Sequence, residues 1–397
     1  MNIIQEIKNI GHFFEAHFWR AVYGIPDKGM RLFGVTGTNG KTTTSYLLAS
    51  VLEQAHGKEH VGMLTTVSFR IGGKEEINET KMTTLPSRKI FSYLARMKKR
   101  GIEYVVLETT SHALDQHRIA GIQFDGAIIL NIAREHLDYH ATLEQYAAAK
   151  ERIVHYLRIG APLVGKQDDD YVRPMLDRAE KNGLNVVRMT DADIQSTHAE
   201  LSGSINKENA CAVTLLAHAL KIPDTTIQVG IDAVKSVPGR MERVITPQGV
   251  TVIIDYAVTP DALERLYSEV KKDLKDGAKI FGTVSAAGLR DRGKRPDMAR
   301  AVAKYADRII VTREDPWTES EEQIFNDLEQ GLPADQQGKQ WQRIVDRKEA
   351  LATLLQEAKS GDVVIATGKG AERGMGIGND IIAWNERGII EEIVKSL

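Results

Sequence analysis

The sequence lacks several features that would place it in particular classes of protein. Cysteine is nearly absent: one residue, Cys211, in 397 excludes an intrachain disulfide and any zinc site built from cysteines. No apolar run is long enough to cross a membrane, since charged residues and histidines interrupt even the aromatic stretch at residues 13–19. The 52 Lys and Arg against 54 Asp and Glu provide no basic stripe for nucleic acid. We therefore expect a cytoplasmic protein with no nucleic-acid partner and no membrane span, of unspecified oligomeric state.

The chain does contain a glycine turn between an apolar run and an amphipathic run. Residues 36–44 read Thr-Gly-Thr-Asn-Gly-Lys-Thr-Thr-Thr, which is a shortened variant of the usual phosphate-binding loop. Gly37 and Gly40 would allow successive backbone N–H groups to face one anion at a helix N-terminus. Lys41 adds a full positive charge, and the Thr42 hydroxyl suits a Mg²⁺ that bridges β- and γ-phosphates. The flanking strand and helix favour a phosphate site over an ordinary helix cap.

Two later apolar runs also end in polar side chains. The first ends at Glu108, and the second is followed by a segment that contains His136 and His140. Because the carboxyl ends of parallel strands meet at one edge of a sheet, Glu108 is expected beside the phosphate site as a metal ligand. One histidine alone would more often cap a helix or pack than catalyse. The clustering of His112 with these two after successive strand ends favours a functional role.

Strand and helix patterns alternate along the chain, which predicts an α/β protein with mainly parallel sheets and helices on both faces. A turn near residues 236–242 separates two such series. We expect a short N-terminal segment (1–30), a central P-loop-type domain (31–236) and a C-terminal Rossmann-like α/β domain (237–397). Near the end of the central domain, Asn206 and Asn209 open a helix that they could cap, or they could read the edge of a base.

Together these motifs resemble the Mur ligase family, and within it the synthetases that add the third amino acid of the peptidoglycan stem peptide. The resemblance runs from about residue 32 to the C-terminus, with the motifs in the family's order. They are Gly37–Thr43, Thr83 with Thr84, Glu108–Leu114, Asn131–His140, Ala149 with Lys150, Asn206 with Asn209, Pro238–Arg243, Asp255–Ala257, Arg290–Pro296, Asp346 with Arg347, and Gly368–Gly370.

The resemblance implies roles for these residues. One Mg²⁺ would be held by Thr42 and Glu108 and a second by His136, and Lys150 would be carbamylated, so that a new carboxylate helps to bind metal. The catalytic set consists of Lys41, Glu108, His136 and Lys150. ATP would contact Gly37, Thr38, Asn39, Gly40, Lys41, Thr42, Thr43, Asn206, Asn209, Arg240 and Asp255. The substrate that bears the carboxylate would face Thr83, Thr84, Ser111 and Arg118, and the incoming amino acid would face Arg290, Asp315 and Glu372.

The implied chemistry is ATP-dependent amide formation between a small carboxylate acceptor and an amino acid. The carboxylate attacks the γ-phosphate to give an acyl phosphate, and the amine then displaces phosphate. Magnesium, Lys41 and the loop N–H groups would offset the charge on the transferred phosphoryl group. The active site is expected between the central and C-terminal domains, where closure would exclude water.

The chain departs from the family's pattern in several places. Thirty residues precede Arg31, where the family has a whole domain that grips the UDP end of its substrate, and the section between Asp193 and Asn206 is short. Residues 314–317 read Glu-Asp-Pro-Trp, where many diaminopimelate-adding members have Asp-Asn-Pro-Arg. Ala371, Val258 and Leu289 replace two histidines and an aspartate that the family usually has.

Three hypotheses therefore stay open. The first is a ligase that acts on a muramoyl peptide. The second is a ligase of the same family that acts on a non-UDP acceptor, such as a poly-amino-acid or a folate-like carboxylate. The third is a non-catalytic, nucleotide-binding partner subunit, against which the presence of Lys41, Thr42, Glu108, His136 and Lys150 argues.

Overall fold

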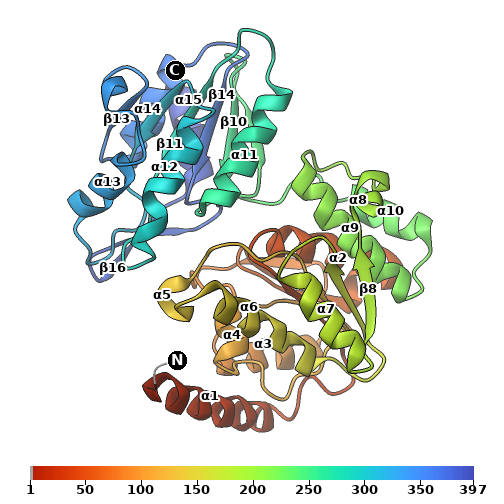
Figure 1. The fold of residues 1–397 in the computed structure, drawn as a ribbon. Helices are drawn as coiled ribbons and strands as arrows, with labels where there is room; N and C mark the ends of the chain where they lie inside the picture. The colour runs from red at the N-terminus through yellow and green to blue at the C-terminus, as the bar shows by residue number, and fades with distance from the viewer. Residues whose placement is uncertain (1–2) are drawn as a thin grey trace. The chain divides into compact units, whose positions relative to one another are not determined.

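The computed structural model describes residues 3–397. The chain divides into two compact parts, which we call unit 1 (up to Lys235) and unit 2 (Ser236–Leu397), and Figure 1 shows the course of the chain. No helix among the described residues is long and apolar enough to cross a membrane.

Unit 1 is built on one eight-stranded sheet. Six strands are parallel, and two at one edge, β3 and β4, form antiparallel pairs. The parallel part confirms the predicted α/β class, and its central strands are buried along their length because helices cover both faces. In spatial order the strands are β4 (Lys74–Ile77), β3 (Ser68–Ile71), β2 (Val61–Leu64), β5 (Tyr104–Glu108), β1 (Arg31–Thr36), β6 (Gly126–Ile129), β7 (Pro162–Lys166) and β8 (Asn185–Met189).

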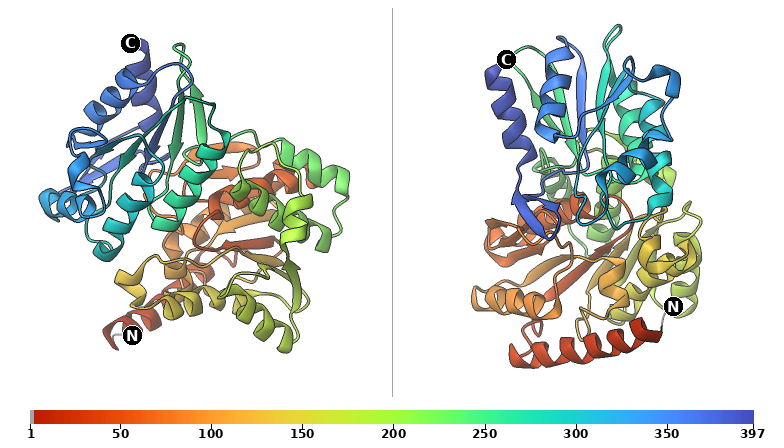
Figure 2. Two further views of the ribbon diagram at one scale, coloured as in Figure 1. Left: turned by 45° about the horizontal axis from the view of Figure 1, so that its top comes forward. Right: turned by 90° about the vertical axis from the view of Figure 1, so that its left-hand side faces the viewer.

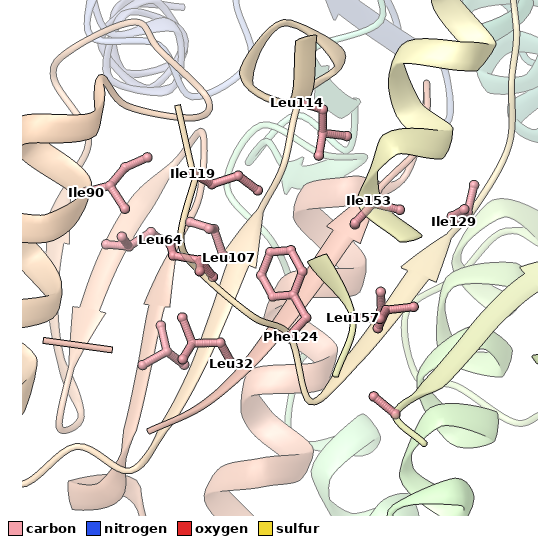
Figure 3. Packing of buried hydrophobic residues seen from close by; sticks show 14 of the residues in the cluster. Leu32, Leu64, Ile90, Leu107, Leu114, Ile119, Phe124, Ile129, Ile153 and Leu157 are labelled. Carbon is pink, nitrogen blue, oxygen red and sulfur yellow. The ribbon is translucent and has the colours of Figure 1, made fainter. Parts of the chain in front are cut away.

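The helices of unit 1 divide between the two faces of this sheet. One face carries a large apolar core to which α3, α4, α6 and α7 contribute, and Figure 3 shows part of it around Phe124. The other face is covered by α2 and α9, and α10 packs on α2. The helices are α1 (Ile3–Val22), α2 (Lys41–His56), α3 (Ser87–Lys99), α4 (Ser111–Asp115), α5 (Leu137–His140), α6 (Leu143–Glu151), α7 (Val172–Lys181), α8 (Asp191–Ser196), α9 (Ser204–Ala219) and α10 (Asp224–Asp232), with short 3-10 turns at Lys58–His60 and Arg152–Tyr156.

Helix α1 covers the outside of unit 1, next to α3 (Figure 2). Its inner side buries Ala16 and Asn9, and the Asn9 side-chain amide donates a hydrogen bond of 3.1 Å to the Asp115 carboxylate. Arg20 forms a two-pronged ion pair with Asp27 just beyond the helix. These contacts fix one side of α1 on the unit.

Unit 2 has a six-stranded sheet that is parallel except for β9, and a separate two-stranded hairpin. Apolar cores lie on both faces, one under α11, α12 and α13 and the other under α14 and α15. The strands are β13 (Trp341–Arg343), β12 (Arg308–Val311), β11 (Ile280–Val284), β14 (Val363–Thr367), β10 (Thr251–Asp255) and β9 (Glu242–Ile245), with β15 (Gly374–Ile377) and β16 (Asp380–Ala383) in the hairpin. The helices are α11 (Pro260–Asp273), α12 (Arg295–Ala303), α13 (Glu321–Glu329), α14 (Arg347–Glu357) and α15 (Glu386–Ser396), with 3-10 turns at Arg292–Lys294 and Ala334–Gln336.

Unit 2 also contains a completely buried ion pair. The Arg347 guanidinium, at the start of α14, donates to both carboxylate oxygens of Glu386, which begins α15. It also donates to the Thr367 carbonyl oxygen at 2.6 Å, and the Trp384 indole donates to Glu386 at 2.7 Å. Both charged side chains are inaccessible to solvent. The pair therefore joins α14 and α15 to the end of β14, and its hydrogen bonds replace those that the two charged groups would make to water.

Candidate active site in unit 1

The glycine turn connects β1 to α2, as the sequence predicted. Gly40 has a φ of 84°, in the left-handed region, and the next residue, Lys41, starts the helix. A Cβ at Gly40 would lie 2.2 Å from the Asn209 side-chain oxygen, so α9 approaches the turn closely. Asn209 is buried, and its side-chain nitrogen has no hydrogen-bond partner among the described residues. A buried amide donor without a partner at a glycine turn is a group that a bound ligand would satisfy.

Gly40→Ala is expected to destabilise the protein by about 2–3 kcal/mol more than Gly101→Ala, because the added methyl would overlap Asn209. Gly101 is the matched control: its φ is 74°, so alanine is strained there too, but a Cβ would meet nothing within 4 Å. Urea unfolding of the two variants measures the difference. Equal losses in both would show that Asn209 does not restrict the turn.

Asn39 and Asn131 hold the turn against the loop after β6. The Asn39 backbone N–H donates to the Asn131 side-chain oxygen at 2.9 Å, and the Asn131 amide donates back to the Asn39 carbonyl at 3.2 Å. The Lys41 ammonium donates to the Thr38 carbonyl at 2.7 Å, and Thr43 is buried in the first turn of α2. The turn is thus a fixed loop with its cation at the helix start.

Glu108 lies at the carboxyl end of β5, in register with Val35 of β1, directly before the turn. Its buried carboxylate accepts a hydrogen bond from the Thr42 hydroxyl, at 3.1 Å to each oxygen. It also accepts from Thr66, through the backbone N–H at 2.9 Å and the hydroxyl at 3.0 Å. The structure therefore brings together two of the residues predicted to hold metal, Thr42 and Glu108.

Lys150 reaches the same turn from α6. Its ammonium donates to the Gly37 carbonyl at 2.7 Å and lies 4.5 Å from the centre of the Tyr146 ring. Burial holds the pKa of Lys150 well below its usual value, and the charge of Lys41 lowers it further, although Glu135 and Glu108 oppose this. Burial and the Lys41 charge thus disfavour the ammonium relative to an exposed lysine, and the neutral amine is the nucleophilic form.

The three clustered histidines do meet in the structure. The His112 ring lies 4.7 Å from the His136 ring and 5.4 Å from the His140 ring, measured between centroids. Burial lowers the pKa of His136, with Glu135 opposing it and the charges of Lys150 and Lys41 adding to it. Burial is also the main cause that lowers the pKa of His140 to about 4. Both therefore favour the neutral imidazole, the form that binds metals.

The residues predicted to face the acceptor surround the end of β5. The Thr83 and Thr66 hydroxyl oxygens lie 2.9 Å apart, and Thr84 donates to the Glu108 carbonyl at 2.9 Å. Arg118 donates to the Thr84 carbonyl at 2.9 Å, and the Ser111 hydroxyl lies 3.0 Å from the His140 ring nitrogen. Thr84 and Ser111 thus contact Glu108 and His140 directly, while Thr83 and Arg118 are each linked to Glu108 through one intervening residue.

The remaining predicted nucleotide contacts are divided between the units. Asn206 lies in the first turn of α9 and donates to the Ser202 carbonyl at 2.7 Å, while Gly203 is the N-cap, so neither asparagine caps that helix. In unit 2, the Asp255 carboxylate accepts from the backbone N–H groups of Met241 and Ala257, both at 2.7 Å. The Arg240 guanidinium stacks 4.6 Å from the centre of the Tyr256 ring.

Two of the three residues predicted to meet the amino acid lie together in unit 2. The buried Lys369 ammonium bonds to Asp315 at 2.8 Å and to Glu372 at 2.6 Å. Burial alone would lower the pKa of Lys369, but the two carboxylates outweigh it and raise the pKa. Arg290 lies on the exposed loop after β11.

Sequence reasoning missed three side chains that support these groups. Thr66 follows a strand of four residues, and the rule that strand ends carry site residues could have found it. Tyr146, which packs on Lys150, reads as an ordinary core aromatic. Lys369 belongs to the Gly368–Gly370 motif. Its partner Glu372 is three residues away, but Asp315 is distant in sequence, so no spacing indicates that second ion pair.

The donor set of unit 1 fits a hard cation. No group of three or more His, Cys, Asp or Glu that could hold a metal occurs in the described part of the chain. The Thr42 hydroxyl and Glu108 carboxylate instead offer two oxygen ligands beside a phosphate-type loop, and Mg²⁺ is typically held by one or two carboxylates with phosphates and water.

The fold and these groups define an α/β enzyme of the ligase class, assembled from two units. The sequence matches the family description "Mur ligase middle domain" over residues 35–229 and "Mur ligase, glutamate ligase domain" over residues 239–370. The chain belongs to the Mur ligase family, as the motifs predicted, and is an acid–amino acid ligase.

Among curated relatives, a UDP-N-acetylmuramoyl-L-alanyl-D-glutamate–2,6-diaminopimelate ligase of Parabacteroides distasonis is 36% identical over 368 residues, covering 88% of this chain and 75% of the relative. A UDP-N-acetylmuramyl-tripeptide synthetase of Roseiflexus is 33% identical, covering 92% and 79%. Among solved structures, a diaminopimelate ligase is 28% identical, with a TM-score of 0.58 and coverage of 93% and 79%. A folylpolyglutamate synthase of Mycobacterium tuberculosis complexed with ADP, at 16% identity and a TM-score of 0.73 over 90% and 91%, shares the fold.

Proposed function

We propose that the protein uses ATP to join the amine of an amino acid to a carboxylate of a muramoyl peptide. One observation carries the proposal: the Thr42 hydroxyl, next to Lys41 in the phosphate-type loop, is held by the strand-end carboxylate of Glu108. That arrangement suits a magnesium–triphosphate complex. Curated relatives at 32–36% identity that are named for ligation to UDP-N-acetylmuramoyl-L-alanyl-D-glutamate support the choice of acceptor.

We assign ATP to the residues around the turn, with Gly37, Thr38, Asn39, Gly40, Lys41, Thr42 and Thr43 on the phosphates. The unsatisfied Asn209 amide would gain a partner from the nucleotide. Magnesium would be held by Thr42, Glu108 and His136, and when bound it would neutralise charge on the triphosphate. Asn206, Arg240 and Asp255 stay predicted nucleotide contacts.

Lys150 is proposed to carry a carbamate. Burial lowers the pKa of this amine, and in its neutral form the amine can add to carbon dioxide and lose a proton to give a carboxylate. That product would place an anion near Glu108, where a divalent cation would offset the added negative charge. A carbamylated Lys150 would thus be a third oxygen donor for magnesium.

In the proposed reaction, an oxygen of the acceptor carboxylate bonds to the γ-phosphorus, and ADP leaves. The amine nitrogen then bonds to the acyl carbon, loses a proton, and phosphate departs with its bonding electrons. Lys41 and the loop N–H groups would stabilise the transferred phosphoryl group. Thr83, Thr84, Ser111 and Arg118 are proposed to contact the acceptor.

The amino acid is proposed to meet Asp315, Glu372 and Arg290 of unit 2. Asp315, Glu372 and Lys369 together carry one net negative charge, which would attract a protonated amine. A backbone N–H from Gly376 donates to Asp315 at 2.8 Å and fixes its carboxylate.

Product mass tests the proposal. The full-length protein is incubated with ATP, magnesium, a mixture of amino acids and one acceptor at a time: UDP-linked muramoyl dipeptide, free muramoyl dipeptide, polyglutamate or dihydropteroate. We expect ADP, phosphate and an amide product with a muramoyl acceptor. A product formed only from the polyglutamate or pteroate acceptor would assign the non-UDP alternative, and no product with any acceptor would favour the partner-subunit hypothesis.

A further inference from the structure

Helix α1 carries an apolar row on the side that faces away from unit 1. Ile10, Phe14, Phe18 and Val22 recur at every fourth position, so they share one face of the helix. Their exposed fractions are 59%, 65%, 59% and 55%. We call these four residues the α1 stripe. The opposite face holds Asn9 and Ala16, which are buried against the unit.

The α1 stripe is unusual for a water-exposed surface. Single exposed apolar residues are common and need no explanation, and Ile159 in a loop is one of them. A continuous row of two aromatic and two aliphatic side chains on one helix is different, because such rows mark interaction sites. The four side chains are held outward by the anchoring of α1 through Asn9 and Arg20.

The neighbouring helix α3 supplies charge of one sign. Its sequence, Ser-Arg-Lys-Ile-Phe-Ser-Tyr-Leu-Ala-Arg-Met-Lys-Lys, contains no acidic residue, and α1 packs directly against it. Exposed cations, which we call the cation row, lie along it and just after it: Arg88, Lys89, Lys98, Lys99 and Arg100. None of the five forms an ion pair within the described residues.

Two contacts place the cation row beside α1. The Arg88 guanidinium lies 4.9 Å from the centre of the Trp19 ring of α1. Lys98 donates to the Ile25 carbonyl, just after the helix, at 3.3 Å. Two exposed acids, Glu6 and Glu15, lie on α1 and a third, Glu103, follows the cation row, against the five cations of that row. The surface therefore combines apolar side chains with adjacent positive charge.

We propose that α1 and α3 form a docking surface for an anionic lipid bilayer, on which α1 lies flat with its stripe among the acyl chains. Amphipathic helices bind in this way when a bulky apolar face is paired with cations that meet anionic headgroups. Neither the α1 stripe nor the cation row binds a bilayer strongly by itself, so the attachment is reversible and needs both. It requires no membrane-spanning helix and does not depend on the proposed substrates.

The charge pattern argues against a second copy as the occupant. A two-fold dimer brings the same patch of both copies together. The two cation rows would then lie near one another with few acids to offset them, which costs energy unless anions intervene. An anionic bilayer offsets the same charges directly.

Sedimentation of the full-length protein with vesicles tests the inference. We expect binding to vesicles of phosphatidylcholine mixed with phosphatidylglycerol, weaker binding at high salt, and little binding to phosphatidylcholine alone. The variants Phe14→Ser/Phe18→Ser and Lys98→Glu/Lys99→Glu should each bind at least about tenfold more weakly, since one cation near such a surface changes affinity about fivefold.

Matched controls distinguish loss of the proposed docking surface from the general effect of removing apolar side chains or reversing charges. Ile159→Ser/Val229→Ser removes two exposed aliphatic side chains elsewhere in unit 1, and Lys271→Glu/Lys272→Glu reverses two charges on α11. Both should bind like the unaltered protein, and circular dichroism should be unchanged in all variants. No binding to anionic vesicles, or equal binding by all variants, would overturn the inference. So would light scattering that shows a dimer which Phe14→Ser/Phe18→Ser dissociates.

Discussion

Replacing Lys41 with alanine is expected to lower kcat by about a hundred- to a thousandfold while the fold is retained. The ammonium is the only full positive charge within the glycine turn, and it lies at the start of α2, where the proposed triphosphate would be. Loss of one preorganised group that stabilises a transferred phosphoryl group has an effect of this size. Release of ADP in the presence of a productive acceptor and amino acid measures it.

Lys58→Ala is the matched control for Lys41→Ala. Lys58 is an exposed lysine in the short turn that follows α2, so its removal changes the net charge equally but leaves the phosphate loop intact. We expect kcat within about twofold of the unaltered enzyme, as for surface changes in general. Turnover by Lys41→Ala at the rate of this control would refute the assignment of the phosphate site.

Arg347→Met is expected to destabilise the protein by about 3–5 kcal/mol, because it leaves the Glu386 carboxylate buried without its cation. The guanidinium also satisfies the Thr367 carbonyl, which would lose that hydrogen bond. Urea unfolding followed by the fluorescence of Trp384, which contacts Glu386, reports on this part of unit 2 directly.

Two further variants define the cause. Lys348→Ala removes the next residue's exposed ion pair with Glu392 and should cost less than about 1 kcal/mol. The double variant Arg347→Met/Glu386→Leu removes both buried charges and should recover much of the loss. A loss for Arg347→Met no larger than that for Lys348→Ala would mean that water reaches Glu386 after the substitution.

Local patterns made part of this protein predictable. The glycine turn is encoded in consecutive residues, and Glu108 ends an apolar run, so the rule that parallel strands end at one edge was enough to place it beside the turn. The parallel α/β architecture follows from the alternation of runs in the same way. The functional roles of the site residues stay predictions.

Other features depend on contacts that no local pattern encodes. Asn209 approaches Gly40 from a helix that lies far along the chain, and Lys369 meets Asp315 across unit 2. Residues 1–30 were predicted only as a short N-terminal segment, and the structure shows that most of them form helix α1. The hairpin β15–β16 is short and partly exposed, which leaves little periodicity to detect.

The edge strand β4 has a consequence for solubility. Its residues, Lys-Glu-Glu-Ile, are all exposed, and its outer backbone groups are open to pairing with a strand from another molecule. Three consecutive charges at this border disfavour such growth, since a second copy that added its own β4 would bring repelling side chains into contact. The largest sheet of the protein thus ends in a segment that resists fibril formation.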